Sequence, residues 1–301
     1  VDNPFRRFDF EPLPAGAAYG RTRAMLKIQD GCNNFCTYCV IPYTRGRIRS
    51  LPPDEMARQA AHLAEEGYRE LVLTGIEIAS YGVDLPGKPD LADVVCAIAD
   101  AAPHMRLRLG SIEPSVITED FCKKIADCGS VCRHFHLSLQ SGCDATLKAM
   151  NRKYDTARYD ESVRLLHTYF PGCAVTTDLI VGFPGETEEE FEDTLSLIEE
   201  VRYDALFPFI FSPRAGTPAA KMDDPTPKEE KNRRFDRLVA LQNRISEEKH
   251  RAYIGRTFRV LIDGRDGDLL TARTDGGRLV RLSGGDGLIG QFRDVRITGS
   301  T

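Results

Sequence analysis

The sequence predicts an α/β protein, with a partial (β/α)6 barrel of the TIM type followed by a small all-β barrel. Two observations lead to this prediction. Short apolar runs alternate with longer segments of helical period through most of the chain, which is the pattern of parallel strands joined by crossover helices. After Gly255, short runs of period two are separated by glycine-rich turns, which is typical of a small antiparallel barrel.

The first part of the chain contains six strand-helix units. The predicted strands cover residues 24–29, 70–75, 106–111, 134–140, 174–182 and 205–212. The helices predicted between them cover residues 53–66, 91–101, 118–128, 157–169 and 188–201. Thr187 is placed to cap the last of these helices, and the glutamates after it suit the positive end of the helix dipole.

These patterns divide the chain into four parts. Residues 1–20 lack periodicity and contain several Pro and Gly, so they are predicted to be a linker. A partial barrel is predicted over residues 21–226, a bridging helix over 227–254 and a β-barrel over 255–301. Because the chain opens on a linker and without methionine, we expect a further domain upstream.

Bulk composition is that of an ordinary globular protein. The chain has 301 residues and a net charge of -5. It has neither a run of about 18 apolar residues nor a signal peptide, so we expect a cytoplasmic protein without a membrane partner. The charge is uneven, since residues 251–301 carry nine arginines against six aspartates. A polyanion would therefore meet this tail first.

Three of the nine cysteines lie close together. Cys32, Cys36 and Cys39 form CxxxCxxC at the carboxyl end of the first predicted strand, where an α/β barrel has its active site. Three thiolates can hold three irons of a 4Fe-4S cluster and leave the fourth iron open. Zinc is an alternative, but structural zinc takes four ligands and the next Cys or His, His62, lies in a predicted helix. Three merely buried thiols would be unexpected in so polar a loop.

Polar residues also follow the next strands. Because the carboxyl ends of parallel strands meet at the mouth of a barrel, we expect these side chains to lie near the cysteines. Taken alone, each of these segments also fits an ordinary turn. The residues are Thr74, Gly75 and Glu77 in LTGIE, Glu113 in GSIEPS, Ser138 and Gln140 in SLQSG, and Asp178 in DLIVGFPGE.

The CxxxCxxC motif, with the aromatic Tyr38 before its last cysteine, resembles that of the radical S-adenosylmethionine superfamily. LKIQDGCNNFCTYCVIPYTRGRIRS, LVLTGIEIASYG, HLSLQSGCDATLKAMNRKY, TTDLIVGFPGETEEEFEDT and FSPRAGTPAA resemble successive blocks of its methylthiotransferases. The glycine-rich tail resembles their RNA-binding TRAM domain. The blocks look most like the branch that acts on threonylcarbamoyladenosine next to the tRNA anticodon. The isopentenyladenosine branch and the branch that modifies a ribosomal-protein aspartate are the alternatives.

The resemblance implies a radical enzyme that adds a methylthio group to the adenine ring. It implies one 4Fe-4S cluster on Cys32, Cys36 and Cys39, and S-adenosylmethionine bound at the open iron and cleaved to a 5′-deoxyadenosyl radical. The implied partners are tRNA and an electron donor such as flavodoxin or ferredoxin. Contacts to S-adenosylmethionine are implied for Tyr38, Thr74, Gly75, Glu77, Glu113, Ser138, Gln140 and Asp178.

The chain departs from this family at its amino end. Members carry a second 4Fe-4S cluster on three cysteines of an N-terminal domain, whereas no cysteine precedes Cys32 here. We therefore expect the chain to hold the radical-generating barrel and the RNA-binding tail, and to lack the second cluster that full activity requires.

Several basic residues are candidates for substrate contact. Arg45, Arg47 and Arg49 follow the cysteines, and Arg152 lies in NRKY. A guanidinium could grip RNA phosphate or the substrate's carboxylate, and the alternative is a solvated loop paired with nearby acids. A non-catalytic RNA-binding protein with a structural cysteine loop is the competing class of function.

Other His and Cys residues carry less weight. His134 and His136 share a strand face and are interpreted as a packed pair that lines the barrel. Cys122, Cys128 and Cys132 are expected to be small core thiols.

Overall fold

The computed structural model describes residues 3–7, 9–13 and 22–300. The linker predicted over residues 1–20 lies partly outside the described residues. The part that is described contains the short 3-10 helix η1 (Pro4–Arg6). Among the helices of the described residues, none has both the length and the apolar character that crossing a membrane would take.

Seven parallel strands form the open barrel that the sequence predicts, because the predicted strand over residues 106–111 is divided at Gly110 into β5 and β6. They lie in two sheets, ordered β1-β4-β5 and β6-β7-β8-β9. The two sheets adjoin, because β5 leads into β6 through Gly110 and Leu107 forms a bridge with Val131, just before β7. The strands are β1 (Arg23–Lys27), β4 (Glu70–Thr74), β5 (Arg106–Leu109), β6 (Ser111–Ile112), β7 (His134–Leu137), β8 (Ala174–Val181) and β9 (Ala205–Ile210).

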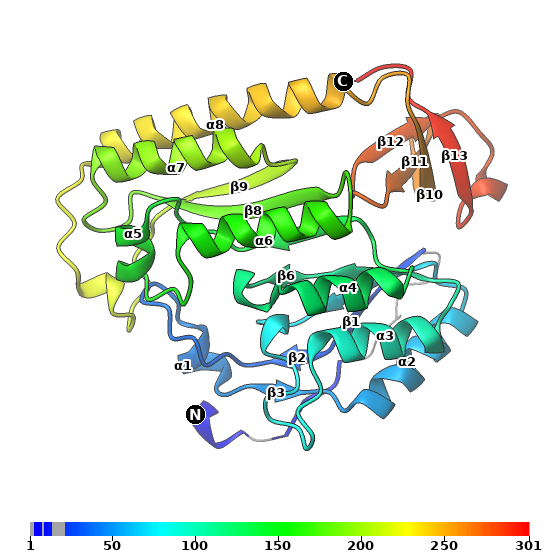
Figure 1. The fold of residues 1–301 in the computed structure, drawn as a ribbon, viewed down its shortest axis with the longest axis horizontal. Helices are drawn as coiled ribbons and strands as arrows, with labels where there is room; N and C mark the ends of the chain where they lie inside the picture. The colour runs from blue at the N-terminus through cyan, green and yellow to red at the C-terminus, as the bar shows by residue number, and fades with distance from the viewer. Residues whose placement is uncertain (1–2, 8, 14–21, 301) are drawn as a thin grey trace.

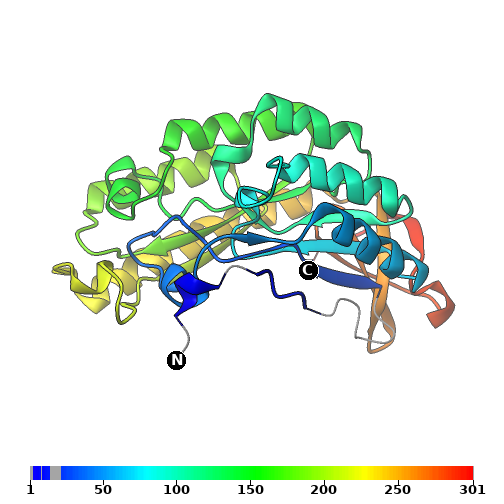
Figure 2. The ribbon, with the colours of Figure 1, turned by 90° about the horizontal axis from the view of Figure 1, so that it is seen from below.

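Helices cover one side of these strands and leave the other side concave (Figure 1 and Figure 2). Strand residues that face the helices are apolar and buried, such as Leu71 and Leu107. Their neighbours along the strands point the other way, and several are charged or polar, such as Glu70 and Arg106. The covering helices are α2 (Pro53–Glu65), α3 (Leu91–Ala101), α4 (Glu119–Asp127), α6 (Thr156–Tyr169) and α7 (Glu188–Val201).

Four short elements near the cysteines were not predicted. The predicted strand over residues 24–29 breaks at Ile28, and its end pairs with a second two-residue strand as an antiparallel ladder. Two short helices were also not predicted: one follows the cysteines in the sequence, and the other contacts the cysteine loop from a distant part of the chain. These elements are β2 (Gln29–Asp30), β3 (Arg49–Ser50), α1 (Ile41–Arg45) and α5 (Asp144–Ala149), together with the 3-10 helices η2 (Ile78–Ser80), η3 (Pro114–Val116) and η4 (Ala219–Lys221).

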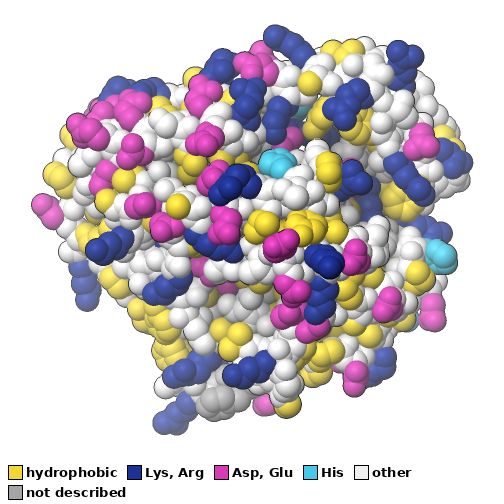
Figure 3. Space-filling view, viewed as in Figure 1, with side chains coloured by type: hydrophobic (Ala, Val, Ile, Leu, Met, Phe, Trp, Pro, Cys, Tyr) yellow, Lys and Arg dark blue, Asp and Glu magenta, His cyan; other side chains and the backbone are white. Residues whose placement is uncertain are grey.

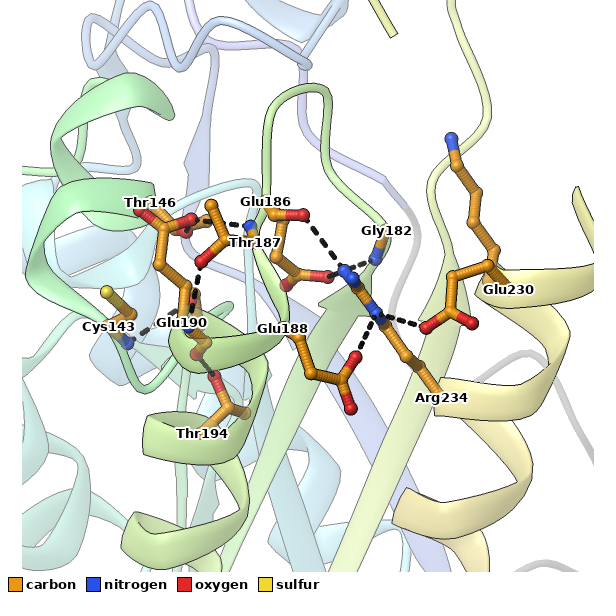
Figure 4. A network of polar contacts seen from close by, with 12 residues as sticks. Cys143, Thr146, Gly182, Glu186, Thr187, Glu188, Glu190, Thr194, Glu230 and Arg234 are labelled. Atoms are coloured by element: carbon orange, nitrogen blue, oxygen red, sulfur yellow. Dashed lines mark hydrogen bonds and ion pairs between the residues drawn. The ribbon is translucent and has the colours of Figure 1, made fainter. Parts of the chain in front are cut away.

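The long helix α8 (Lys228–Arg251) is fixed to the turn after β8 by a buried arginine (Figure 4). Arg234 Nη1 donates to the backbone oxygen and the carboxylate of Glu186, at 2.9 and 3.1 Å. Its Nε donates to Glu188 and Glu230, at 3.1 and 3.0 Å. Glu186 in turn accepts from the backbone N–H of Gly182 at 2.8 Å. The shape of this turn therefore depends on α8.

The chain ends in an antiparallel sheet with strand order β12-β11-β10-β13. It encloses a small core of Val260, Ile262, Leu270 and Ala272. The all-β prediction is confirmed, but no ladder joins β12 to β13 within the described residues, so backbone hydrogen bonds do not close a barrel there. The elements are β10 (Thr257–Asp266), β11 (Leu269–Thr274), β12 (Leu279–Leu282), the 3-10 helix η5 (Asp286–Leu288) and β13 (Phe292–Arg296).

This sheet docks at the amino ends of the barrel strands. Glu70 is fully buried and binds Arg23 and Arg108 at 2.8 and 3.0 Å, as well as Arg106. The two strand β5 arginines then donate to backbone oxygens of the sheet, Arg106 to Arg273 at 3.2 Å and Arg108 to Asp275 at 2.9 Å. The sheet is thus held at the end of the strands opposite to the cysteines.

Candidate functional site

The cysteine loop begins at a glycine that no other residue could replace without strain. Gly31 has a φ of +72°, and a Cβ there would lie 1.9 Å from the backbone oxygen of Arg47. The close approach allows the Cys32 N–H to bond the backbone oxygen of Gly46 at 3.1 Å. The loop is therefore closed on itself before the first cysteine.

Distant segments hold the rest of the loop. The Thr37 N–H donates to the backbone oxygen of Met150 at 3.0 Å, and Asn151 Nδ2 donates to that of Phe35 at 2.9 Å. Phe35, Gln140 and Asn151 all have positive φ, and they are three of the five described non-glycine residues that do. Such strain persists where surrounding contacts enforce it, and it often accompanies a functional site.

A residue that the sequence analysis did not single out connects two parts of the site. Gln29 is fully buried at the end of the first strand. Its Nε2 donates to the backbone oxygen of Gly31 at 2.7 Å, and its Oε1 accepts from the N–H groups of Ile76 and Glu77 at 3.0 and 2.9 Å. Gln29 thus sets the cysteine loop against the LTGIE turn. The available signal was an amide at the carboxyl end of the predicted strand, directly before the cysteine loop.

The three thiols lie in one electrostatic environment. The pKa of the Cys32 thiol is raised to about 11, mainly by burial and also by the neighbouring Glu77, Cys36 and Cys39. The hydrogen bond from the Asn34 N–H acts in the opposite direction and lowers this pKa. Burial likewise raises the pKa of Cys39. Metal binding releases these protons because the thiolate is the ligand.

A buried ion pair lies beside the middle cysteine. Arg152 Nη1 is 3.2 Å from Cys36 Sγ, and Arg152 Nη2 is 3.7 Å from Glu113 Oε1. Arg152 Nη2 and Glu113 Oε1 are both buried, and neither makes a hydrogen bond among the described residues. Burial and the nearby Glu113 also raise the pKa of Glu77 to about 7. Unsatisfied groups of both signs fit a ligand that carries an ammonium and a carboxylate, as the methionyl end of S-adenosylmethionine does.

A pocket of about 230 Å³ opens next to this pair. It is lined by Tyr38 from the cysteine loop, by Gln140, and by Asp178 and Ile180 of β8. Burial raises the pKa of the Tyr38 hydroxyl strongly. Tyr38 and Ile180 pack against an apolar cluster that includes Phe211, so one wall of the pocket suits a flat aromatic group.

The structure brings most of the predicted site residues together. Ser138 hydrogen-bonds Ser111 at 2.6 Å on the strands next to Glu113. Thr74 differs, because its hydroxyl donates to the backbone oxygen of Leu26 at 3.3 Å, within the barrel wall. Gly75 packs closely, since a Cβ there would lie 2.9 Å from the backbone oxygen of Gln29.

The arginines after the cysteines do not share one role. Arg45 and Arg47 are exposed, as a contact to substrate would require. Arg49 is buried, 3.3 Å from Asp30, and donates to the backbone oxygens of Arg45 and Arg47 at 3.0 and 2.8 Å. The suggestion that Arg49 grips RNA or substrate is therefore wrong, because its guanidinium holds the loop itself.

The other His and Cys residues also have definite places. His136 lies 3.1 Å from Asp178 and 3.0 Å from the Thr176 hydroxyl, which in turn lies 3.2 Å from His134. Cys122 and Cys132 are free and buried, as expected of core thiols. Cys128 is not a free thiol, because it is bonded to Cys96 of the neighbouring helix.

A cavity of about 910 Å³ lies away from the CxxxCxxC loop, between the barrel and the C-terminal sheet. Arg106, Arg133, Arg256 and Arg259 line it, together with Phe258 and Phe292. Figure 3 shows Lys and Arg side chains on both sides of the recess where the sheet meets the barrel. Its basic and aromatic lining suits an RNA strand better than a small cosubstrate.

The open barrel with a CxxxCxxC loop after its first strand defines a class of protein, and comparison with known families agrees with it. The Radical SAM superfamily model matches residues 26–198, more than half of the chain, and the TRAM domain model matches residues 251–301. The chain belongs to the radical SAM superfamily, whose members use a 4Fe-4S cluster and S-adenosylmethionine.

Within that superfamily, the chain is similar to proteins named tRNA-2-methylthio-N(6)-dimethylallyladenosine synthase. The proteins from Clostridium botulinum (strain Langeland) and Alkaliphilus oremlandii are each 43% identical to it, over 278 and 290 residues. The alignments cover 91% and 95% of this chain. The chain spans 62% and 61% of the length of these relatives.

Solved structures share the fold at low identity. Coproporphyrinogen III oxidase from Escherichia coli, a radical SAM enzyme, aligns with a TM-score of 0.57 at 15% identity, over 88% of this chain and 72% of its own. A radical S-adenosylmethionine methyltransferase from Kitasatospora setae aligns with a TM-score of 0.55 at 18% identity, over 65% and 38%. This likeness concerns the fold alone.

Proposed function

We propose that this chain is the catalytic part of a tRNA methylthiotransferase, and that its substrate is N6-dimethylallyladenosine. The observation that carries the proposal is the Arg152–Glu113 pair, whose unsatisfied atoms lie beside Cys36 in a chain that matches both family models. The names of the similar proteins support the choice of reaction and of substrate.

The proposed roles follow from the geometry. When bound, a cluster held by Cys32, Cys36 and Cys39 would supply the electron that cleaves S-adenosylmethionine. Arg152 would bind the carboxylate of the methionyl end, and Glu113 and Glu77 its ammonium group. Tyr38 and Ile180 would hold the adenine against the apolar wall of the pocket. Burial of these groups excludes water, which would otherwise quench a reactive species.

The substrate proposal departs from the threonylcarbamoyl branch that the sequence blocks suggested. The similar proteins are named for the dimethylallyl compound, which carries the isopentenyl-type substituent of the alternative. The burial of Arg49 also weakens the argument for a substrate carboxylate, because Arg45 and Arg47 are the exposed arginines left in this loop and Arg45 lies 4.0 Å from Asp30.

Further parts of the proposal concern partners. The C-terminal sheet would bind tRNA, and a flavodoxin or ferredoxin would reduce the cluster. The complete enzyme would carry a second 4Fe-4S cluster, and it would act in the cytoplasm, where tRNA is modified. Methylthio transfer is proposed for that complete enzyme rather than for this chain alone.

Cluster binding is tested by anaerobic reconstitution of the chain. We expect about four irons for each chain and release of 5′-deoxyadenosine with a strong reductant, since one 4Fe-4S cluster is proposed. Cys36→Ala should abolish both, whereas Cys173→Ala, which removes a buried thiol elsewhere, should keep them. Stoichiometric zinc without nucleoside release would refute the radical assignment.

Substrate identity is tested by mass spectrometry of tRNA nucleosides from cells that lack the gene. We expect the methylthio form of dimethylallyladenosine to disappear and unmethylthiolated dimethylallyladenosine to accumulate. Loss of the methylthio form of threonylcarbamoyladenosine would instead restore the first interpretation. Unchanged tRNA with an unmodified ribosomal-protein aspartate would move the substrate to protein.

A further inference from the structure

The concave face of the barrel carries two exposed aromatic side chains. Phe207 and Phe209 of β9 are 49% and 55% exposed. The preceding residue of the strand, Leu206, is buried. Alternate residues of a strand point to the same side, so both rings project from the concave face. Half-exposed phenylalanines on a sheet interior are unusual for a soluble domain and indicate a binding surface.

A carboxylate lies directly beside these rings. In the parallel ladder between β8 and β9, Asp178 is the partner of Phe207, and Ile180 is the partner of Phe209. Asp178, Ile180 and Phe209 also line the 230 Å³ pocket next to the cysteine loop. The aromatic surface is therefore continuous with the place proposed for S-adenosylmethionine.

One oxygen of this carboxylate is occupied and the other is free. His136 Nε2 lies 3.1 Å from Asp178 Oδ2, and the ring of His136 stacks near Phe207 with centroids 5.8 Å apart. The Thr176 hydroxyl fixes the other side of the imidazole at 3.0 Å. Asp178 Oδ1 has no hydrogen-bond partner in the part of the chain that the structure describes, and the side chain is 32% exposed. A single acceptor is thus presented beside an aromatic surface.

We propose that His136, Asp178, Phe207 and Phe209, here called the floor patch, form the seat of the target nucleobase. The base stacks on Phe207 and Phe209, and its N6–H donates to Asp178 Oδ1. His136 is a positioning residue that aims the carboxylate. This inference rests on the proposed function and names the residues that recognise its substrate.

The chemistry of the floor patch selects an uncharged N6-alkyladenine. Such a base has one N6–H, which matches the single free oxygen of Asp178, whereas guanine offers two adjacent donors on its Watson–Crick edge. An apolar dimethylallyl group suits the exposed phenyl rings. A threonylcarbamoyl group would bring a carboxylate toward Asp178, and the repulsion between like charges would weaken binding.

The inference is tested by the affinity of the cluster-reconstituted chain for anticodon stem-loops, measured by fluorescence anisotropy. Four RNAs differ only at the target position, which holds dimethylallyladenosine, threonylcarbamoyladenosine, adenosine or an abasic site. We expect the dimethylallyl RNA to bind about tenfold more tightly than the abasic RNA, as one stacked base contributes.

Two variants and one control locate the effect. Phe207→Ala should remove most of the difference between dimethylallyl and abasic RNA. Asp178→Asn should bring the affinity for threonylcarbamoyl RNA closer to that for dimethylallyl RNA, because the negative charge is gone. Val83→Ala, an exposed apolar residue outside the floor patch, should leave all four affinities unchanged.

The outcomes separate this inference from the proposed function. Equal binding of dimethylallyl and abasic RNA by the unaltered chain would overturn the floor patch, as would variants that keep the full difference. Weaker binding of all four RNAs by the same factor in Phe207→Ala would also overturn it, because the face would then hold something other than the base. The proposed function fails instead if cells lacking the gene keep their methylthiolated tRNA, whatever these affinities are.

Discussion

Arg152 shows how a single residue organises the site. Its guanidinium is 6% exposed and lies between Cys36 and Glu113. Burial alone would lower its pKa, but Tyr154, Tyr38, Cys36 and Glu113 around it raise that pKa further above its ordinary value. A permanent positive charge is therefore kept beside the cysteine loop, where it partly opposes the effect of burial on the pKa of Cys39.

Glu70 is a second residue whose charge the fold depends on. Burial opposes its ionisation, but Arg108, Arg106 and Arg23 lower its pKa to about 2 from an ordinary 4.5. The depressed value means that the ion pairs stabilise the fold above about pH 4.5 and are lost as the pH falls toward 2. A shift of this size corresponds to about 3 kcal/mol.

We expect Glu70→Gln to be strongly destabilised at pH 7, because the buried Arg108 and the partly buried Arg106 and Arg23 lose their counter-charge. The difference from the unaltered chain in free energy of unfolding should shrink as the pH is lowered from 5 to about 2, since Glu70 itself becomes neutral there. Urea unfolding of the metal-free chain at several pH values measures this. Glu161→Gln on an exposed helix face is the control, and a difference independent of pH would contradict the assignment.

Individual site residues could be predicted to different degrees. Glu113, Ser138 and Gln140 were identifiable because the ends of parallel strands converge whatever else the chain does. The partners of Arg152 were not, since the contact joins residues 116 positions apart. Arg49 was misjudged because its burial results from the pairing of β2 with β3, two strands too short to show any periodicity.

At the scale of elements, the turn after β8 depends on helix α8. Gly182, in that turn, is bonded to Glu186, and Glu186 is bonded to Arg234 (Figure 4). Burial raises the pKa of Glu186, and the Gly182 N–H and Arg234 oppose this. The buried Glu186 carboxylate therefore needs Arg234 in order to stay charged. Through this pair, helix α8 stabilises the turn after β8 at the open end of the barrel.

Arg234→Ala should destabilise the chain by about 3–5 kcal/mol, because it leaves Glu186 buried and unpaired. Arg233→Ala is a matched control, since Arg233 binds the same Glu188 and Glu230 but is 52% exposed. Its loss should cost less than about 1 kcal/mol. Chemical denaturation compares the two, and equal losses would show that burial of the pair is not what matters.

Elements of normal length followed from the sequence. Helix α3 has the predicted bounds, and α7 does as well, because an apolar stripe and a capping box mark both of them in the structure. Helices α1 and α5 were not predicted, since five or six residues do not complete two turns of an apolar pattern. Their positions are set by contacts to the cysteine loop rather than by local preference.

At the scale of the whole molecule, the proposed cluster site and the proposed RNA site lie at opposite ends of the strands. The cysteines lie at the carboxyl ends, and the basic cleft lies at the amino ends beside the C-terminal sheet. Arg256 and Arg259 stack on Phe258 and Phe292, with guanidinium-to-ring distances of 5.2 Å. Within the described part of the chain neither arginine forms an ion pair with a carboxylate, so both are available to phosphate.

Replacing Arg256 and Arg259 together by Gln should weaken tRNA binding and make it less sensitive to salt. Each lost phosphate contact reduces the slope of log affinity against log salt by about 0.7–0.9, so the double variant should lose about 1.5. Arg244→Gln, whose charge is paired with Glu199 and Glu248, should keep the slope. Titrations at several salt concentrations decide this, and an unaltered slope in the double variant would place the RNA elsewhere.

The docking of the C-terminal sheet has a consequence for how such a protein can change over time. Arg106 and Arg108 bond the backbone oxygens of Arg273 and Asp275, which every amino acid possesses. At these two points the attachment depends on the path of the main chain, and the side chain of Arg278 adds a contact to Asp204 Oδ1 at 3.2 Å. Substitution of the outer side chains of the sheet should therefore leave the join to the barrel intact, provided that Arg278 is kept.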